Sequence, residues 1–285
     1  MSNDIFGNII SNAAVAASKA NPPVEGDYKG ANGLLYCGKC HTPKQCKYIA
    51  LGKTHIVSCI CKCKIEQRDR EKKAQEEAER VYCRELQRQS AFADDKTRSF
   101  IFELDDKRNA EASQFARNYA AGFNSKSKWL FFNGNCGTGK SFYAACICNA
   151  VIDKGFTAKF TSISEIEREI WKAGDKNEVY EDIKRYDLLI LDDFSAERDT
   201  SYMQEIAYNV IDSRLRSGKP IIITSNLTSA ELSNPKNRTQ ERTLSRICEN
   251  SIIYTISGSD RRKEKLKQTI KEETAKVMNG SALSP

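Results

Sequence analysis

Eight residues, GNCGTGKS at positions 134–141, constrain the fold of this chain more than any other segment. They match the pattern G-x-x-x-x-G-K-[ST], follow the apolar run KWLFF, and precede a segment with helical periodicity. Glycines let backbone N–H groups curl around phosphate oxygens, and the N-terminus of the following helix adds partial positive charge. We therefore expect Lys140 to reach the β- and γ-phosphates of a nucleotide and the Ser141 hydroxyl to bind Mg²⁺. The residues expected to contact the nucleotide are Gly134, Asn135, Cys136, Gly137, Thr138, Gly139, Lys140 and Ser141.

Apolar runs alternate with helical patterns beyond about residue 100. Strands that are apolar throughout are typical of a parallel sheet covered on both faces, and their alternation with helices predicts an α/β fold. The sequence therefore predicts a parallel sheet flanked by helices. The expected strands are KWLFF, TAKFTS, YDLLILDD, IIITSN and SIIYTI, and the expected helices lie in 106–123, 141–155, 164–171 and 201–220.

Polar side chains end two of the expected strands. The run LLILDDF places Asp192 and Asp193 at the carboxyl end of the sheet, beside the phosphates. Asp192 is expected to bind Mg²⁺, and Asp193 to orient and polarise the attacking water. An Asp there is one methylene shorter than a Glu, so the water must lie closer or hydrolysis will be slow. Asn226, at the end of IIITSN, is placed to hold the same water or the γ-phosphate; the alternatives are a capping Asp pair and ordinary Ser-Asn turn chemistry.

Six of the eleven cysteines fall between positions 37 and 63. Cys37 and Cys40 form a C-x-x-C knuckle, and SCICKC supplies Cys59, Cys61 and Cys63 about twenty residues later. Four thiolates make a closed structural zinc site, and we favour Cys37, Cys40, Cys61 and Cys63, with Cys59 as the substitute ligand. An extended 59–63 segment would put its three cysteines on one side. Cys46, His41 and His55 are less favoured ligands, and unliganded thiols or a redox C-x-x-C are the alternatives.

The remaining segments differ mainly in charge and turn content. The segment 64–89 is rich in charged residues and Gln, and it lacks Gly and Pro, so it is expected to be a helix. It serves either as a solvated connector or as a DNA-tracking face. The basic segment 261–276 either extends a DNA-facing surface or is a solvated terminal helix. The expected organisation is a flexible segment at 1–30, a zinc module at 31–65, a charged helical linker at 66–100, a nucleotide-binding domain at 101–265 and a basic tail at 266–285.

Composition limits the setting of the chain without fixing its partners. The net charge of +7 permits a nucleic-acid partner but does not demand one. No run approaches the roughly 20 apolar residues of a membrane span, and the N-terminus lacks the basic region of a secretory signal. Its apolar stripe of Ile5, Phe6, Ile9 and Ile10 is either a docking segment or a frayed end. An odd number of clustered cysteines favours a metal and a reducing cytoplasm over secreted disulfides.

Three arginines follow the expected sheet core. Arg242 and Arg246 lie four positions apart in RTLSR, on one face of an expected short helix. A solvated pair is the simple interpretation. A phosphate loop and two carboxylates nevertheless leave the negative charge on the γ-phosphoryl group poorly neutralised in the transition state. Arg246 could supply a positive charge to the nucleotide of a neighbouring protomer. Arg261, in SGSDRR, could touch the nucleotide of its own subunit.

The order of these motifs resembles an AAA+ ATPase, and more narrowly the DnaC/DnaI-type replicative helicase loaders and the related IstB-type transposition helpers. The resemblance covers about residues 100–265. It implies that Arg246 is a trans-acting finger, Arg242 an interface arginine and Arg261 the second sensor. Those loaders read S-Y-R where this chain has Ser259-Asp260-Arg261, so an added negative charge adjoins the sensor arginine.

The resemblance implies an ATP-dependent loader that binds ATP, Mg²⁺, single-stranded DNA and a replicative helicase, and that self-associates through its ATPase domain. The zinc module would contact the helicase, as an N-terminal Cys-rich domain does in some loaders. Turnover is expected to be slow without DNA or partner. A transposition helper is the first alternative, and a nucleotide-switched zinc protein with negligible turnover is the second.

Overall fold

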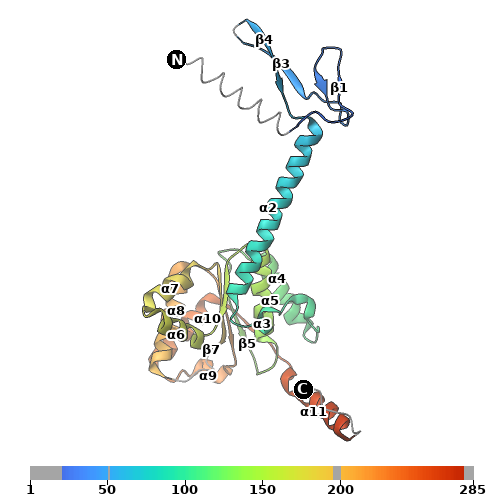
Figure 1. Ribbon diagram of the computed structural model, residues 1–285. Helices are drawn as coiled ribbons and strands as arrows, with labels where there is room; N and C mark the ends of the chain where they lie inside the picture. The colour runs from blue at the N-terminus through green and yellow to red at the C-terminus, as the bar shows by residue number, and fades with distance from the viewer. Residues whose placement is uncertain (1–20, 51, 195–199, 279–285) are drawn as a thin grey trace. The chain divides into compact units, whose positions relative to one another are not determined.

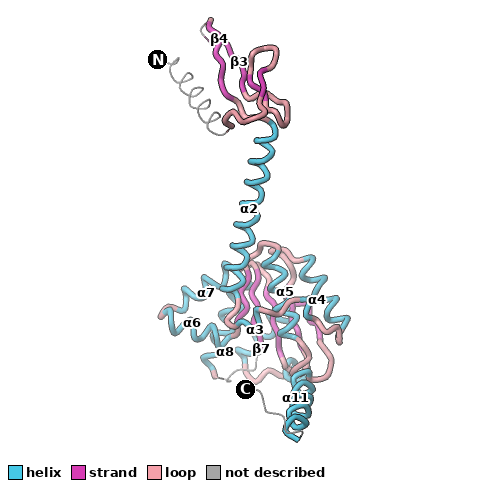
Figure 2. The backbone as a smooth tube through the Cα atoms, turned by 45° about the vertical axis from the view of Figure 1, so that its right-hand side comes forward, coloured by secondary structure: helices cyan, strands magenta, loops and turns pink. Residues whose placement is uncertain are grey.

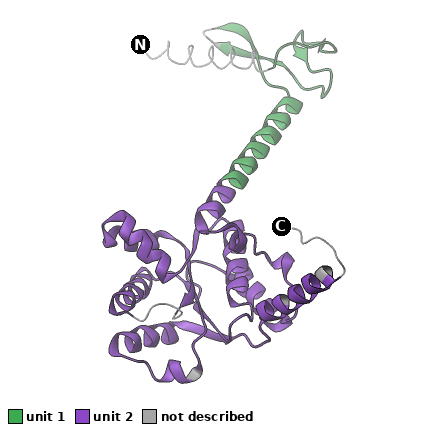
Figure 3. Ribbon diagram, turned by 60° about the horizontal axis from the view of Figure 1, so that its bottom comes forward, with its two compact units in different colours: residues 1–82 green, residues 83–285 purple. Residues whose placement is uncertain are grey.

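The computed structural model describes residues 21–50, 52–194 and 200–278, and these divide between two compact units, residues 1–82 and 83–285 (Figure 3). The expected N-terminal apolar stripe and the last part of the basic tail lie outside the described residues. None of the helices in the described ranges combines the length and the apolar character that a membrane span requires.

The larger unit is built on a five-stranded parallel sheet (Figure 1). Its strand order is β6-β7-β8-β5-β9, and every neighbouring pair is parallel, which confirms the predicted fold class. Strand β5 therefore lies between β8, the middle strand, and β9, an edge strand. The strands are β5 (Trp129–Asn133), β6 (Ala158–Thr161), β7 (Leu188–Phe194), β8 (Ile221–Ser225) and β9 (Ser251–Thr255).

Helices cover both faces of this sheet (Figure 2). Side chains alternate between the faces along each strand, so Leu188 and Ile190 join one buried cluster and Leu189 and Leu191 the other. The first cluster includes residues of α4 and α5, and the second includes residues of α6, α7, α8 and α10. The helices of this unit are α3 (Asp95–Arg98), η1 (Phe102–Leu104), α4 (Ala110–Gly122), α5 (Lys140–Asp153), α6 (Ile163–Ala173), α7 (Lys176–Arg185), α8 (Ser201–Ser217), α9 (Ser229–Ser233), α10 (Arg238–Asn250) and α11 (Arg261–Met278).

Several helices differ from the sequence expectation: α4 starts later, and α3, α7 and α9 had no predicted counterpart. Helix α4 begins at Ala110, four residues later than expected, because Asn109 caps it by accepting a hydrogen bond from the backbone N–H of Ala112. Helix α7 was not predicted. It follows the left-handed Gly174, and Asp175 caps it by accepting from the N–H of Asn177.

The smaller unit contains two antiparallel pairs and the start of a long helix. Strands β1 (Tyr28–Lys29) and β2 (Leu35–Tyr36) pair, as do β3 (Gln45–Ala50) and β4 (Lys53–Ser58). Helix α2 (Lys62–Ala91) contains the predicted helical segment. The expectation that 59–63 is extended was wrong, because α2 starts at Lys62 and places Cys63 in its first turn.

Candidate functional site

The predicted phosphate loop joins β5 to α5 in the larger unit. Three of its glycines, Gly134, Gly137 and Gly139, have φ values of 144°, 76° and 104°, in the region that side chains disfavour. A Cβ at Gly134 would lie 2.3 Å from the carbonyl oxygen of Ile256, just beyond β9. The loop therefore needs glycine for both its backbone conformation and its packing against a neighbouring strand end.

Lys140, the first residue of α5, is buried in this loop with 5% of its surface exposed. Its Nζ donates to the carbonyl oxygens of Gly134 and Asn135, both at 2.8 Å, and to Oδ1 of Asn226. Burial lowers the pKa of Lys140 from its ordinary value, and the nearby thiol of Cys136 and carboxylates of β7 partly oppose that shift. The loop, the β8 end and the lysine thus converge at one place.

The two carboxylates of β7 lie at a break in the strand pairing between Leu191 and Phe194. Thr224 of β8 contacts both residues: its Oγ1 donates to Oδ1 of Asp192 at 2.6 Å and accepts from the backbone N–H of Asp193 at 3.0 Å. Asp193 has a φ of 51°, which is uncommon for a residue other than glycine. The bulge turns the carboxylates toward the cleft that follows the sheet edge.

Burial raises the pKa of Asp192, and hydrogen bonds from Thr224 and Ser141 act in the opposite direction. The contact joins the Ser141 hydroxyl to the Asp192 carboxylate, so the two predicted magnesium ligands lie side by side. Hydroxyl and carboxylate oxygens are the ligands that Mg²⁺ takes beside a nucleotide phosphate. The residues at this position fit the ion.

A cleft of about 430 Å³ runs along these residues. It unites the predicted Lys140, Asp192, Asp193, Asn226 and Arg261. The full lining is Lys96, Thr97, Phe100, Cys136, Gly137, Gly139, Lys140, Ser141, Phe142, Asp192, Asp193, Asn226, Arg261 and Arg262. Of the remaining loop residues, Thr138 is buried and donates to the carbonyl oxygen of Asn135 at 3.0 Å.

Arg246 lies elsewhere. It is not among the described residues that line the cleft. Its Nη1 lies 2.9 Å from Oδ1 of Asp212 in α8, and its guanidinium carbon lies 4.5 Å from the centre of the Tyr208 ring. Arg242, one turn earlier on α10, is exposed. The structure therefore separates the predicted finger from the nucleotide cleft of its own chain.

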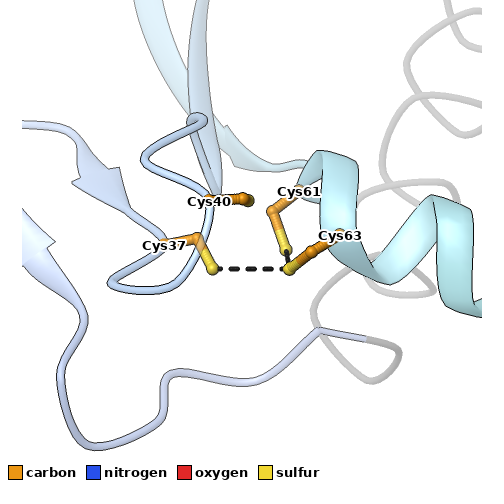
Figure 4. A group of neighbouring side chains, drawn as sticks. All are labelled: Cys37, Cys40, Cys61 and Cys63. Atoms are coloured by element: carbon orange, nitrogen blue, oxygen red, sulfur yellow. Dashed lines mark hydrogen bonds between the residues drawn. The ribbon is translucent and has the colours of Figure 1, made fainter.

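Four cysteines of the smaller unit gather their sulfur atoms within 4.8 Å of one another: Cys37, Cys40, Cys61 and Cys63 (Figure 4). Cys37 Sγ lies 3.7 Å from Cys63 Sγ, which lies 3.5 Å from Cys61 Sγ. Four sulfurs at ~2.3 Å from a tetrahedral zinc ion lie roughly 3.8 Å apart. The spacing and the thiolate donor set therefore fit zinc.

The thiols differ in their surroundings. A hydrogen bond from Thr42, followed by one from the backbone N–H of Cys63, lowers the pKa of Cys40 to about 5. A depressed pKa favours the thiolate that metals bind. Cys59 lies outside the group of four, donates to the carbonyl oxygen of Pro43 at 3.4 Å, and has its pKa raised to about 11, chiefly by burial.

A buried ion pair supports the knuckle. Lys44 Nζ lies 2.6 Å from Oδ2 of Asp27, and the two side chains are 2% and 3% exposed. Asp27 Oδ1 in turn accepts from the backbone N–H of Gly38, between the first two cysteines, at 3.1 Å. A Cβ at Gly38 would lie 2.0 Å from the carbonyl oxygen of Gly26. Residues 22–30 thus contact the cysteine module directly.

Several residues of both sites were not predicted. Thr224 could have been predicted from the sequence, because it directly precedes Ser225-Asn226 in a strand that ends beside the carboxylates. Lys96, Thr97 and Phe100 line the cleft from a segment with no nucleotide-binding pattern. No sequence pattern links Asp27 to Lys44, and only the structure shows that they form an ion pair.

A phosphate loop between a parallel strand and a helix, beside a strand that ends in two carboxylates, defines a P-loop nucleotide-binding protein. The family model described as IstB-like ATP binding protein matches residues 64–269, and the chain belongs to that family.

Individual relatives agree with this assignment. The replicative helicase loader DnaC of Escherichia coli (strain K12) is 25% identical over 150 residues, 51% of this chain and 60% of that protein. The replicative helicase loader DnaI of Bacillus subtilis (strain 168) is 30% identical over 112 residues, 38% of this chain and 36% of that protein. The matches therefore span less than two thirds of each relative. A crystal structure of the DnaC helicase loader shares the fold, with a TM-score of 0.52 and 23% identity, covering 57% of this chain and 100% of that chain.

Proposed function

We propose that this protein is an ATP-dependent loader of a replicative DNA helicase. One observation carries the proposal. The cleft unites the phosphate loop, the two carboxylates of β7 and Asn226 of β8, in a chain whose relatives include loaders named DnaC and DnaI.

In this proposal each side chain of the cleft has a distinct task. Lys140 binds the β- and γ-phosphates of ATP, and Asn226 holds that lysine and the γ-phosphate. Asp193 orients and polarises the attacking water. Arg261 contacts the γ-phosphate. Mg²⁺, when bound by Ser141 and Asp192, neutralises charge on the phosphates.

The two ends of the chain take different partners in this proposal. The cysteine module at 31–65, with zinc on Cys37, Cys40, Cys61 and Cys63, contacts the helicase, and 66–100 links it to the ATPase domain at 101–265. That domain binds single-stranded DNA and pairs with a second copy, to which Arg246 is offered. Hydrolysis is slow until DNA or helicase is present, and the protein works in the cytoplasm.

A loading assay tests the proposal. The replicative helicase of the source organism, closed single-stranded DNA circles and MgATP are mixed with the wild-type protein or with Lys140→Ala. Wild type should place the helicase on the circles, and the variant should not. Equal loading with and without the wild-type protein would contradict the proposal.

The family match favours one second candidate, a helper ATPase for transposition. A helper remodels duplex DNA for a transposase and does not engage a helicase. Binding to duplex DNA in preference to single strands, with no association with the helicase, would favour it. Turnover near zero with DNA and helicase both present would instead favour a nucleotide-switched regulatory protein.

A further inference from the structure

Arg261 lies between the phosphate loop and an acidic segment. It is the first residue of α11, and its backbone N–H donates to the carbonyl oxygen of Gly137 at 3.1 Å. A Cβ built at Gly139 would lie 3.7 Å from its guanidinium carbon. The charged group of Arg261 is thus already beside the loop that is expected to hold phosphates.

The same guanidinium has a carboxylate partner on its other side. Arg261 Nη1 lies 3.1 Å from Oδ1 of Asp106, and the two side chains are 23% and 41% exposed. Asp106 Oδ2 lies 3.2 Å from Nε of Arg108, whose Nη1 lies 2.8 Å from Oε2 of Glu264 in α11. Four charges of alternating sign therefore connect the segment before α4 with the first turn of α11.

The first turn of α11 is fixed from the loop side as well. Asp260 caps the helix by accepting from the backbone N–H groups of Arg262 and Lys263, at 3.0 and 3.2 Å. A Cβ at Gly137 would lie 2.0 Å from its Oδ1. Because the backbone at Arg261 is held in place, a change of partner must come from the side chain.

We propose that Asp106 is a specificity-determining residue: it competes with the γ-phosphate of a bound nucleotide for Arg261. The inference rests on the ATP site proposed above. A triphosphate places negative charge next to Arg261, and each additional contact to phosphate weakens the pair with Asp106. A diphosphate lacks that terminal group and leaves the pair intact. Asp106 therefore lowers the preference of the site for triphosphate over diphosphate.

The test measures dissociation constants of a non-hydrolysable ATP analogue and of ADP, by calorimetry on the full-length protein with Mg²⁺ at low salt. Asp106→Asn keeps the side-chain shape and removes the charge. An ion pair of this exposure is worth up to about a factor of five in affinity, so the triphosphate-to-diphosphate preference should rise by about three- to fivefold. Asp153→Asn removes the same charge from an exposed side chain that pairs with Arg88, and it should leave the preference unchanged.

Two further variants separate competition from simple charge repulsion. In an Arg261→Ala background, Asp106→Asn should no longer raise the preference, because the group for which Asp106 competes is gone. A rise that persists there overturns the proposal. Arg108→Gln removes the other cation of Asp106, strengthens its hold on Arg261, and should lower the preference by about twofold.

The outcomes distinguish this inference from the ATP site itself. Wild-type protein that binds neither nucleotide overturns both. Wild-type protein that binds both, with Asp106→Asn equal to Asp153→Asn, overturns the inference alone. A lower triphosphate preference in Asp106→Asn also overturns it, since Asp106 would then hold Arg261 toward the phosphate.

Discussion

The described parts of the two units differ in how many apolar side chains they bury. In the larger unit two clusters of buried apolar side chains cover opposite faces of a parallel sheet. In the described part of the smaller unit, the buried apolar residues are Leu34, Cys37 and Cys61, and two of these belong to the sulfur group. Apolar burial at about 25 cal/mol per Å² can support the first unit. The described part of the second unit buries far less, so we expect a metal bound by the four sulfurs to supply the rest.

Metal removal should have the largest effect on the smaller unit. A chelator, or Cys37→Ser, should unfold the smaller unit and leave the larger one folded, since structural zinc in small modules contributes about 10–16 kcal/mol. Hydrogen exchange on the full chain should show lost amide protection at 28–58 and unchanged protection along the strands of the sheet. Wild-type protein should contain about one zinc ion per chain.

Cys46→Ser is the matched control. It changes an exposed thiol of the same unit, outside the group of four, and should keep both zinc and protection. Protein purified without chelator that carries no zinc, or a chelated protein with intact protection, would show that the smaller unit folds by other means.

In the larger unit, the role expected for Arg246 lies outside the nucleotide cleft of its own chain. Arg246→Ala should bind ATP normally and hydrolyse it about 10³-fold more slowly, as expected for loss of a trans finger. Mixing it with Lys140→Ala should restore part of the activity, since one protein keeps an intact cleft and the other an intact finger. Steady-state phosphate release over a range of mixing ratios measures this.

Arg216→Ala serves as the control for Arg246, because Arg216 also pairs with Asp212, at 2.7 Å, and is largely exposed. It should retain wild-type turnover. If both mutants assemble and mixing restores nothing, Arg246 is simply the ion-pair partner of Asp212 and packs on Tyr208.

Asp193 gives the smallest of the three effects. Asp193→Asn should keep ATP affinity and lose about 10²-fold or more in turnover, since the attacking water loses its base. Asn tolerates the left-handed backbone found at this position. Turnover within a few-fold of wild type would assign that role to another group, and Asp153→Asn controls for the lost charge.

The fold of the larger unit was predictable because most of its strands are runs of apolar residues and each is followed by a helix. The predictions that failed in the larger unit concern local structure. Helix α7 lies between β6 and β7, where the sequence pattern predicted a single helix, α6. The N-terminal cap Asp175 is the sequence signal that marks its start. The positive φ of Asp193 comes from the bulge against β8, which depends on strand pairing and not on the residue type.

The two candidate sites also contain residues that the sequence predicts and residues that only the structure shows. The phosphate loop is contiguous, so its chemistry could be predicted directly from the sequence. The grouping of Cys37, Cys40, Cys61 and Cys63 matches the ligand set favoured from spacing, although Cys61 directly precedes α2 and Cys63 lies in its first turn, where an extended segment was expected. Thr224, Asp106 and Phe100 come from separate segments. Only tertiary packing brings Phe100 to the cleft and places Thr224 and Asp106 against Asp192 and Arg261, which line it.

Calorimetric titration of MgATP into full-length protein tests whether the loop at 134–141 binds ATP through Lys140. Wild type should bind about one ATP per chain. Lys140→Ala should bind at least about 100-fold more weakly, because charge-assisted hydrogen bonds to phosphate are lost. Lys172→Ala, an exposed lysine of α6, should bind as wild type does. Equal affinity in wild type and Lys140→Ala would show that Lys140 does not bind the phosphates of ATP.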